Sequence, residues 1–226
     1  MEHTSNLDIK FDVPNTYFGV CVINGPKIKS SDHSLNDLEQ VVFQEVKLRF
    51  PLNELANNPV IRNFRDLYSS YGMDPTKDRI ASEALIRRIH SGQNLWRVNN
   101  VIDAMNLASA LYGLPIGVMD YHKINFPITV RKANVGEPFV KIGGKTVNCS
   151  GKEIVVADNE KILDFGFATA DTDLAKVTDK TKDLLIVVYA TDSIEKTYVN
   201  KALDDVISFI TRFAGGEVAL RYLTKK

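Results

Sequence analysis

Apolar positions follow a helical spacing in the first half of the chain and a strand-like spacing in the second half. The spacing predicts a buried strand at 17–23, followed by helices that begin after Ser34, at Pro59, near 82 and near 99. Ser34 with Asp37 three positions later predicts a capping box at the start of the first helix. Gly113 and Pro115 are typical stop signals for a helix at about 99–112.

The second half reads as strands joined by tight turns. Gly143-Gly144 and Asp158-Asn159 are typical of hairpin turns. The chain then closes with an amphipathic helix at 196–213. Helices early and strands late predict one α+β domain over residues 1–226. The expected strands are 128–133, 139–142, 154–157 and 184–189.

Composition narrows the class of protein. The chain has 226 residues, and its 28 Lys and Arg balance 28 Asp and Glu, so nucleic-acid binding would need a local basic patch. Cys21 and Cys149 form no disulfide framework, no signal-peptide core is apparent, and the longest apolar runs, such as 184–190, are too short for a membrane span. We therefore expect a cytoplasmic protein with no membrane association.

The helix at 99–112 carries an unusual polar face. Its apolar stripe is Val101, Met105, Ala108 and Tyr112, and the opposite side carries Asn99, Asp103, Asn106 and Ala110. A merely solvated face usually carries long charged side chains. Short Asn and Asp side chains either satisfy nearby backbone groups or bind a ligand. Both interpretations stay open at this point.

A cluster of cations precedes that helix. It comprises Lys77, Arg79, Arg87, Arg88, His90 and Arg97. Arg87 lies four residues after Glu83, which predicts an ion pair on one helix face, whereas Arg88 points about a hundred degrees away. Arginine is suited to bidentate phosphate contacts, and the alternative is pairing within the protein.

Polar residues also fill the loop at 168–181, where they predict either a polar pocket or a solvated turn. They are Asp171, Thr172, Asp173, Thr178 and Thr181. No phosphate-binding glycine loop, nucleophile elbow or metal-ligand spacing of histidines is present in the sequence. We therefore expect neither a cofactor nor a metal, and no protein nucleophile.

Two strings carry a family resemblance. FRDLYSSYGMDPTKDRIASEALIRRI and then VIDAMNLASALYGLPIGVMD resemble the B3/B4 domain, the tRNA-binding and editing module of the bacterial phenylalanyl-tRNA synthetase β-subunit, which also exists as free-standing proteins. The resemblance is strongest over 60–190, and the chain looks like a free-standing member. It implies a three-layer α+β fold around a β-sandwich of unusual topology, flanked by helices. It also implies hydrolysis of a misattached aminoacyl ester on tRNA by a positioned water.

The family pattern can be carried over residue by residue. Asn106 matches an asparagine of the synthetase pattern, and Asp120 matches the acid after its Gly-x-Pro turn. Asp173 falls where the synthetase has its editing glutamate. Gly117 stands where the synthetase has a histidine that lines the editing site, so tyrosine editing does not follow, and a wider or an inactive pocket is expected there.

The resemblance, together with the polar and cationic patterns, gives three sets of candidate residues. The catalytic set is Asn106, Asp120, Asp173 and Thr178; the substrate-binding set is Gly117, Asn99, Asp103, Asp171 and Thr181; the RNA-binding set is Lys77, Arg79, Arg87, Arg88 and Arg97. The leading hypothesis is a free-standing editing protein that binds the aminoacylated 3′ end of tRNA. The alternatives are a non-catalytic RNA-binding module and a domain that binds a small, amino-acid-like molecule.

Overall fold

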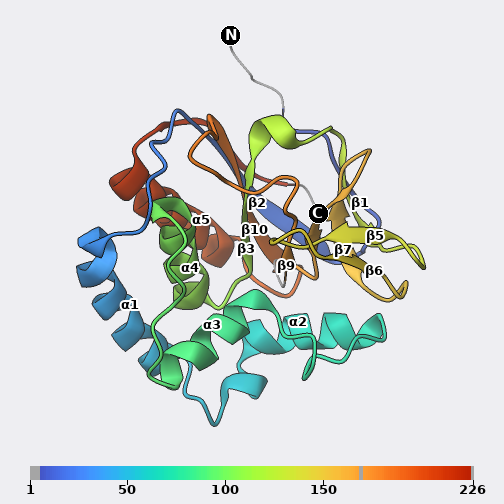
Figure 1. The fold of residues 1–226 in the computed structure, drawn as a ribbon. Helices are drawn as coiled ribbons and strands as arrows, with labels where there is room; N and C mark the ends of the chain where they lie inside the picture. The colour runs from blue at the N-terminus through green and yellow to red at the C-terminus, as the bar shows by residue number, and fades with distance from the viewer. Residues whose placement is uncertain (1–5, 168–169, 225–226) are drawn as a thin grey trace.

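The protein is described by a computed structural model of residues 6–167 and 170–224 (Figure 1). Two sheets pack face to face, and helices cover the outer face of one of them, which gives three layers. The four-stranded sheet has the order β11-β2-β10-β3 and the five-stranded sheet the order β1-β4-β7-β8-β9. The expected α+β class and β-sandwich core are confirmed.

The four-stranded sheet is built on its two longest strands, whose apolar runs are buried on both faces. β10 pairs antiparallel with both β2 and β3, and β11 pairs antiparallel with β2. Its strands are β2 (Thr16–Asn24), β3 (Ile116–Asp120), β10 (Asp183–Thr191) and β11 (Glu217–Leu223).

The five-stranded sheet is antiparallel except for the parallel pair β1 and β4. A small hairpin, β5 with β6, turns at Gly143-Gly144 as predicted. The strands are β1 (Ile9–Phe11), β4 (Ile128–Lys132), β7 (Ile154–Ala157), β8 (Ile162–Phe165), β9 (Ala170–Asp171), β5 (Pro138–Val140) and β6 (Thr146–Asn148).

Five α-helices are present in the described residues, and the predicted starts of α2 to α5 and the predicted end of α4 agree closely with the structure. Asn58 caps α2 with Pro59 at its first position, and Gly113 caps α4 with φ of 64°. The helices are α1 (Asn36–Arg49), α2 (Pro59–Ser70), α3 (Ala81–His90), α4 (Asn100–Tyr112) and α5 (Lys196–Ala214). None of them is long and apolar enough to cross a membrane.

Two expectations about local structure are wrong. Ser34 does not cap α1; Asp32 instead accepts the Ser34 N–H at the start of a 3₁₀ turn (His33–Leu35) that leads into the helix. The helix at 196–213 also does not close the chain as expected, because the strand β11 follows it. β11 occupies the outer edge beside β2, a place that only long-range pairing defines.

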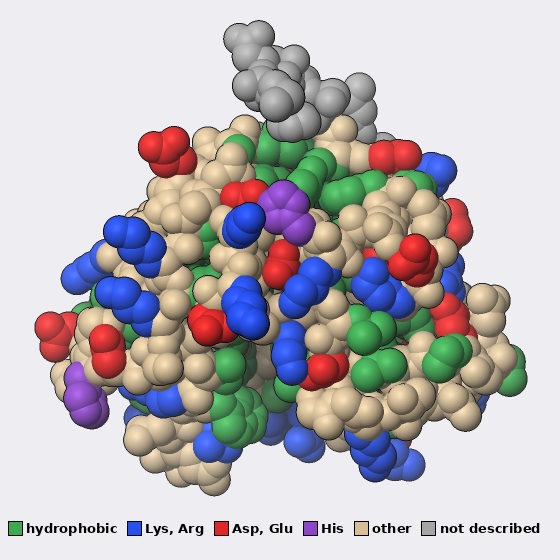
Figure 2. Space-filling model, turned by 45° about the horizontal axis from the view of Figure 1, so that its top comes forward, with side chains coloured by type: hydrophobic (Ala, Val, Ile, Leu, Met, Phe, Trp, Pro, Cys, Tyr) green, Lys and Arg blue, Asp and Glu red, His purple; other side chains and the backbone are tan. Residues whose placement is uncertain are grey.

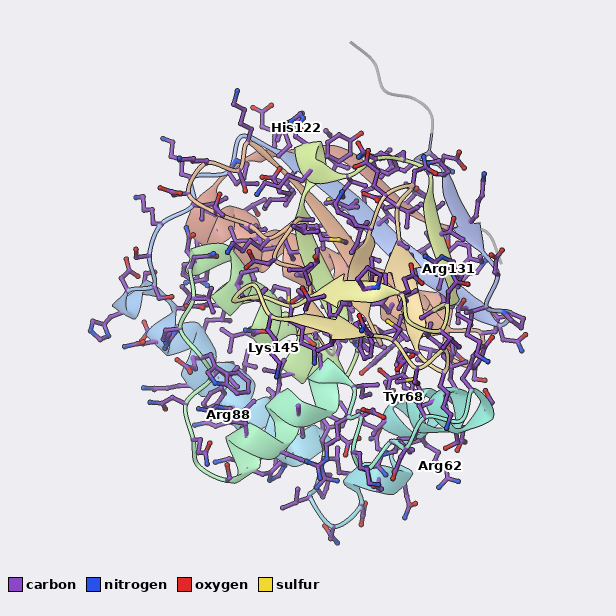
Figure 3. All side chains as sticks on the ribbon, turned by 45° about the vertical axis from the view of Figure 1, so that its right-hand side comes forward. Arg62, Tyr68, Arg88, His122, Arg131 and Lys145 are labelled. Carbon is purple, nitrogen blue, oxygen red and sulfur yellow. The ribbon has the colours of Figure 1, made fainter. Side chains whose placement is uncertain are left out.

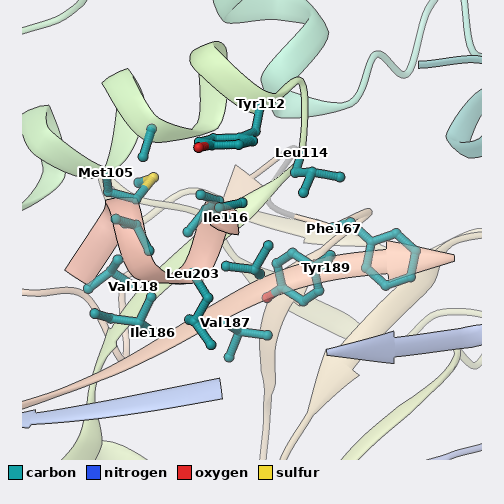
Figure 4. Close-up of a cluster of buried hydrophobic side chains, with 14 of the residues drawn as sticks. Met105, Tyr112, Leu114, Ile116, Val118, Phe167, Ile186, Val187, Tyr189 and Leu203 are labelled. Carbon is teal, nitrogen blue, oxygen red and sulfur yellow. The ribbon is translucent and has the colours of Figure 1, made fainter. Parts of the chain in front are cut away.

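The core lies between the layers (Figure 4). Strand alternation turns Ile116, Val118 and Ile186 toward the helices α4 and α5, while Val187 and Tyr189 face the five-stranded sheet. Between the sheets, aromatic side chains meet edge to face: the Phe18 ring centroid lies 4.9 Å from that of Tyr189 and 4.8 Å from that of Phe11. This packing fixes the position of β3, and β3 carries the candidate residues Gly117 and Asp120.

Candidate functional site

Asp120 ends β3 and anchors the first group of candidate residues. Its side chain is buried; Oδ2 accepts a 2.8 Å hydrogen bond from the Thr181 hydroxyl, and Oδ1 accepts one of 3.2 Å from the His122 backbone N–H. The Lys123 ammonium lies 3.6 Å from Oδ2. A buried carboxylate is stable only when it is paired and hydrogen-bonded. These contacts therefore fix the Asp120 side chain in one orientation.

Thr178 belongs to the same hydrogen-bonded group. Its backbone N–H donates to the Thr181 hydroxyl oxygen at 3.0 Å, so Asp120, Thr181 and Thr178 form a continuous chain of bonds. The half-buried Thr178 hydroxyl oxygen accepts the Lys180 N–H at 3.3 Å. Its proton has no acceptor among the residues that the structure describes. The Thr178 hydroxyl is thus free to donate to a ligand.

Asp173 is tied to the β5–β6 hairpin. Its Oδ1 accepts the Gly143 N–H at 3.0 Å and a hydrogen bond of 2.7 Å from Lys176 Nζ. The Lys176 bond, followed by the Gly143 bond, lowers the pKa of Asp173, so the carboxylate stays ionised. Lys145, labelled in Figure 3, belongs to the same hairpin. One carboxylate oxygen of Asp173 is therefore committed to a structural clamp.

The 171–181 segment joins these residues to β3. Its Ala175 carbonyl accepts the Asp120 backbone N–H at 2.9 Å, and Thr172 forms a bridge with Lys141. Asp120, Thr178 and Thr181 are thus brought together, with Asp173 on the same segment.

Asp171 belongs to a second, buried group. It lies opposite Asp164 in the β8–β9 pair, so the two side chains share one face of the sheet. The Tyr189 hydroxyl donates a 2.8 Å hydrogen bond to Asp164 Oδ2. Burial, followed by the nearby Asp164 charge, raises the pKa of Asp171 to about 8. Asp171 Oδ1 is buried and has no hydrogen-bond partner within the described ranges.

Gly117 lies against this buried group, and the expectation of a wider pocket there is wrong. A Cβ atom at Gly117 would lie 2.9 Å from the Tyr189 hydroxyl oxygen and 3.4 Å from Asp164 Oδ2. Real Cβ atoms essentially never come as close as 2.9 Å. The space that a side chain would need is filled by Tyr189, which approaches from the paired strand β10.

The polar row of α4 has divided roles. Asn99 caps the helix by accepting the N–H groups of Val101 and Ile102, and Asp103 accepts the Val98 N–H at 2.9 Å and the Ser31 hydroxyl at 2.5 Å. These two candidate residues satisfy nearby polar groups. The half-buried Asn106 side chain makes no hydrogen bond with any described residue. Asn106 is therefore the residue of this row that is free to bind a ligand.

The predicted pair of Glu83 and Arg87 is confirmed at 2.8 Å. Glu83 is fully buried, and it also accepts two hydrogen bonds from Arg65, of 2.9 and 2.7 Å. Lys77 lies 3.7 Å from Asp74 on an exposed turn. Arg79 is exposed just before α3.

The remaining two candidate cations lie beside the loop between α3 and α4. Arg97 pairs with Glu39, and its Nη1 lies 3.8 Å from Asp103 Oδ2. Arg88 instead covers the ring of Trp96. Figure 3 labels Arg88 on α3. On the face drawn in Figure 2, Lys and Arg are interspersed with acids rather than forming one continuous basic surface.

Sequence reasoning missed the residues that pack against the candidates. Asp164 and Tyr189 stand inside apolar strand runs, where a register would have been needed to bring them to Gly117. His122 and Asp183 were also missed: His122 Nε2 lies 2.5 Å from Asp183 Oδ2, beside a cavity of about 390 Å³ that Tyr121 and Phe126 also line. The aromatic-rich run directly after Asp120 was the one available signal for that cavity.

The relatives that comparison with known proteins gives are β-subunits of one kind of enzyme. Phenylalanine–tRNA ligase β-subunits of Thermotoga maritima and Chromobacterium violaceum are 30% and 34% identical over 107 and 83 residues, which are 47% and 37% of this chain. The matched parts span only 14% and 11% of those subunits. An N-terminal fragment of the phenylalanyl-tRNA synthetase β-subunit from Pyrococcus horikoshii aligns with 98% of this chain and 55% of its own, at 15% identity and a TM-score of 0.47.

The profile of the B3/4 domain matches residues 63–215, which include α3, α4, β3 and the 171–181 segment. That match covers more than half of the chain and contains every candidate residue described above. The chain therefore belongs to the B3/4 domain family.

Proposed function

We propose that this protein binds tRNA and hydrolyses an amino acid wrongly esterified to the tRNA 3′ end. The β-subunits it resembles are named as ligases for phenylalanine and tRNA, and this chain matches only a small part of them. The observation that carries the proposal is the pair of uncommitted polar groups, the Asn106 amide and the Thr178 hydroxyl, within the B3/4 match.

In the proposed reaction a water attacks the ester carbonyl carbon. The bond to the ribose oxygen breaks, that oxygen takes up one proton of the water, the other proton passes to solvent, and the amino acid leaves as its carboxylate. The Thr178 hydroxyl donates a hydrogen bond to the developing oxyanion, and Asn106 binds a polar group of the amino acid. Asp120 is a positioning residue, because it holds Thr181 and so fixes the turn that carries Thr178. Positioning and electrostatic stabilisation supply the rate enhancement.

The RNA side of the proposal uses two cations, the exposed Arg79 just before α3 and the half-buried Arg88 on α3. Arg88 stacks on the Trp96 ring, whereas Arg87 and Arg97 are partly neutralised by Glu83 and Glu39. Because the net charge of the chain is balanced, phosphate contacts would need a local group of cations such as this one.

Binding without catalysis is the second candidate function, and Gly117 favours it. The Tyr189 hydroxyl fills the place where the resemblance expects a histidine, so no side chain at 117 can act on an ester. On this alternative, tRNA affinity survives Asp173→Ala and Asn106→Ala but falls with Arg88→Ala and with rising salt.

Binding of a small, amino-acid-like molecule is the third candidate function, and the cavity near His122 favours it. Tyr121 and Phe126 offer apolar walls, and Asp183 offers a carboxylate for an ammonium group. A volume of about 390 Å³ lies within the usual range for ligand sites. A free amino acid that raises the melting temperature, together with no binding of any tRNA, would select this function.

The test is release of amino acid from a panel of individually charged tRNAs. The proposal expects faster release from at least one of them than in buffer, and a loss of that gain in Thr178→Val and Asn106→Ala. Asp179→Asn is the matched control, because Asp179 is an exposed neighbour in the same turn. Spontaneous rates for every charged tRNA would reject hydrolysis, and binding measured on the same samples would then separate the second function from the third.

A further inference from the structure

Trp96 is an exposed aromatic side chain in the loop between α3 and α4. It is the single tryptophan of the chain, and 53% of its surface is exposed. The adjacent Leu95 is buried and anchors the loop, whereas Val98 is also exposed. An exposed tryptophan beside a buried anchor indicates a binding surface more strongly than scattered small apolar residues do. Its burial by a partner would remove a large apolar area from water.

Arg88 holds one face of this ring. Its Cζ atom lies 4.2 Å from the Trp96 ring centroid, and its Nε donates a 2.6 Å hydrogen bond to the Asn94 carbonyl. The guanidinium is thus stacked on the indole and tied to the loop at the same time. Since more than half of Trp96 is still exposed, the ring keeps accessible surface beyond the part that Arg88 covers.

The charge around the ring is positive. Residues 84–102 contain three arginines and one histidine, and no Asp or Glu. Arg87 and Arg97 have carboxylate partners, but Arg88 has none among the described residues. The two terminal amino groups of Arg88 also make no hydrogen bond with any residue that the structure describes. A flat open aromatic face beside an uncompensated guanidinium matches a nucleobase with its phosphate.

We propose that Trp96 and Arg88 form a stacking platform for one unpaired nucleotide of the bound RNA. The base stacks on the open face of Trp96, and the amino groups of Arg88 bind the adjacent phosphate. This inference rests on the proposed binding of tRNA and adds the residue on which an unpaired base stacks. Base stacking on an aromatic side chain is sequence-tolerant, so the platform strengthens binding without selecting one base.

The single tryptophan makes the test direct, because all indole fluorescence comes from the platform. Titration of the wild-type protein with tRNA is expected to quench and shift the Trp96 emission. Affinity for labelled tRNA, measured by anisotropy, is expected to fall on the order of tenfold in Trp96→Ala and less in Trp96→Phe. Arg88→Lys keeps the charge but loses the planar stack, and it should also weaken binding.

Two controls distinguish the loss of the stacking contact from the loss of any positive charge and from unfolding of the variant. Arg62→Ala removes an exposed cation on α2, whose pair with Asp66 is solvated, and should leave tRNA affinity within about twofold of the wild type. Unchanged circular dichroism and melting temperature show that each variant is folded. If wild-type protein binds tRNA with no change in emission, and Trp96→Ala binds as tightly, the platform is overturned while the proposed function stands. If wild-type protein binds no tRNA, both are overturned.

Discussion

The Tyr189 hydroxyl donates a 2.8 Å hydrogen bond to the buried Asp164 carboxylate, and it does so in the space directly beside Gly117. Tyr189 reaches this place because Val187 of β10 pairs with Gly117 of β3, and Tyr189 follows two residues later on the same face. Glycine at 117 is thus required by Tyr189, which stands two residues beyond the direct partner Val187. This relationship, rather than an empty pocket, is the structural consequence of the glycine.

Gly117→Ala should destabilise the protein, because the new methyl group meets the Tyr189 hydroxyl at 2.9 Å. Overpacking of this kind costs about 1–3 kcal/mol of unfolding free energy. Urea denaturation of the wild-type and variant proteins measures the loss.

The matched background is Tyr189→Phe, which removes the hydroxyl oxygen and leaves the ring Cε2 at 3.4 Å from the added methyl. In a double-mutant cycle the cost of Gly117→Ala should shrink in this background. An undiminished cost would show that the strain arises elsewhere.

The stability of the protein should fall between about pH 4 and pH 8 because of Asp171. Its pKa is raised from 3.8 to about 8, so over this interval the native state holds a proton that the unfolded chain releases. The unfolding free energy then decreases as the pH rises. Asp171→Asn, which has no proton to lose, should flatten this slope when stability is measured by denaturation at a series of pH values.

Asp173→Asn is the control of opposite sign. The Lys176 and Gly143 hydrogen bonds lower the pKa of Asp173, so its contribution to stability is present above its unfolded pKa and is lost as the pH falls through the folded pKa. The variant should therefore reduce the slope at the acid end and keep the decline toward pH 8. Identical pH profiles for the two variants would refute the assignment.

The elements that could be predicted from the sequence are those with local signals. α2 and α4 have capping asparagines, a proline or a glycine at the ends, and a periodic apolar face. β2 and β10 are long apolar runs. β11, at Glu217–Leu223, has no such signal, because it is an exposed edge strand that is defined by its pairing with β2, almost two hundred residues earlier.

The candidate site likewise contains contacts that local sequence signals predict and contacts that depend on distant parts of the chain. The ion pair of Glu83 and Arg87 follows from one helical turn, and it was predictable. The contact of Gly117 with Tyr189 and Asp164 depends on strand register and on how two sheets pack, neither of which a single sequence encodes locally. The roles of Asn99 and Asp103 were open for the same reason: their partners, such as Ser31, come from another part of the chain.

Glu83→Gln should be strongly destabilising. The buried Glu83 carboxylate lies between the guanidinium groups of Arg65 and Arg87, which offset the cost of its burial and lower its pKa. Loss of the charge leaves these two cations without their counter-ion, and breaking a buried pair costs about 3–5 kcal/mol. The urea midpoint measures the effect. The exposed pair of Arg62 and Asp66 is the comparison, and Asp66→Asn should cost no more than about 1 kcal/mol.

Alanine substitutions of two glycines at helix C-termini allow the cost of backbone strain to be measured separately from that of a steric clash. Gly113, after α4, has φ of 64°, and an added Cβ would lie 2.9 Å from Phe50 Cζ; Gly92, after α3, has φ of 73° and nothing within 4 Å of that position. Gly92→Ala should therefore cost about 1–2 kcal/mol, the strain of a left-handed alanine alone.

Gly113→Ala should cost more than Gly92→Ala, because the methyl group also displaces the buried ring of Phe50. Phe50→Leu provides the test of that cause: it removes the ring atoms, and in its background the two alanine variants should have nearly equal costs. Equal costs already in the wild-type background, measured from thermal and urea unfolding, would mean that Phe50 yields freely. The end of α4 would then tolerate changes at the turn that leads into β3 and Gly117.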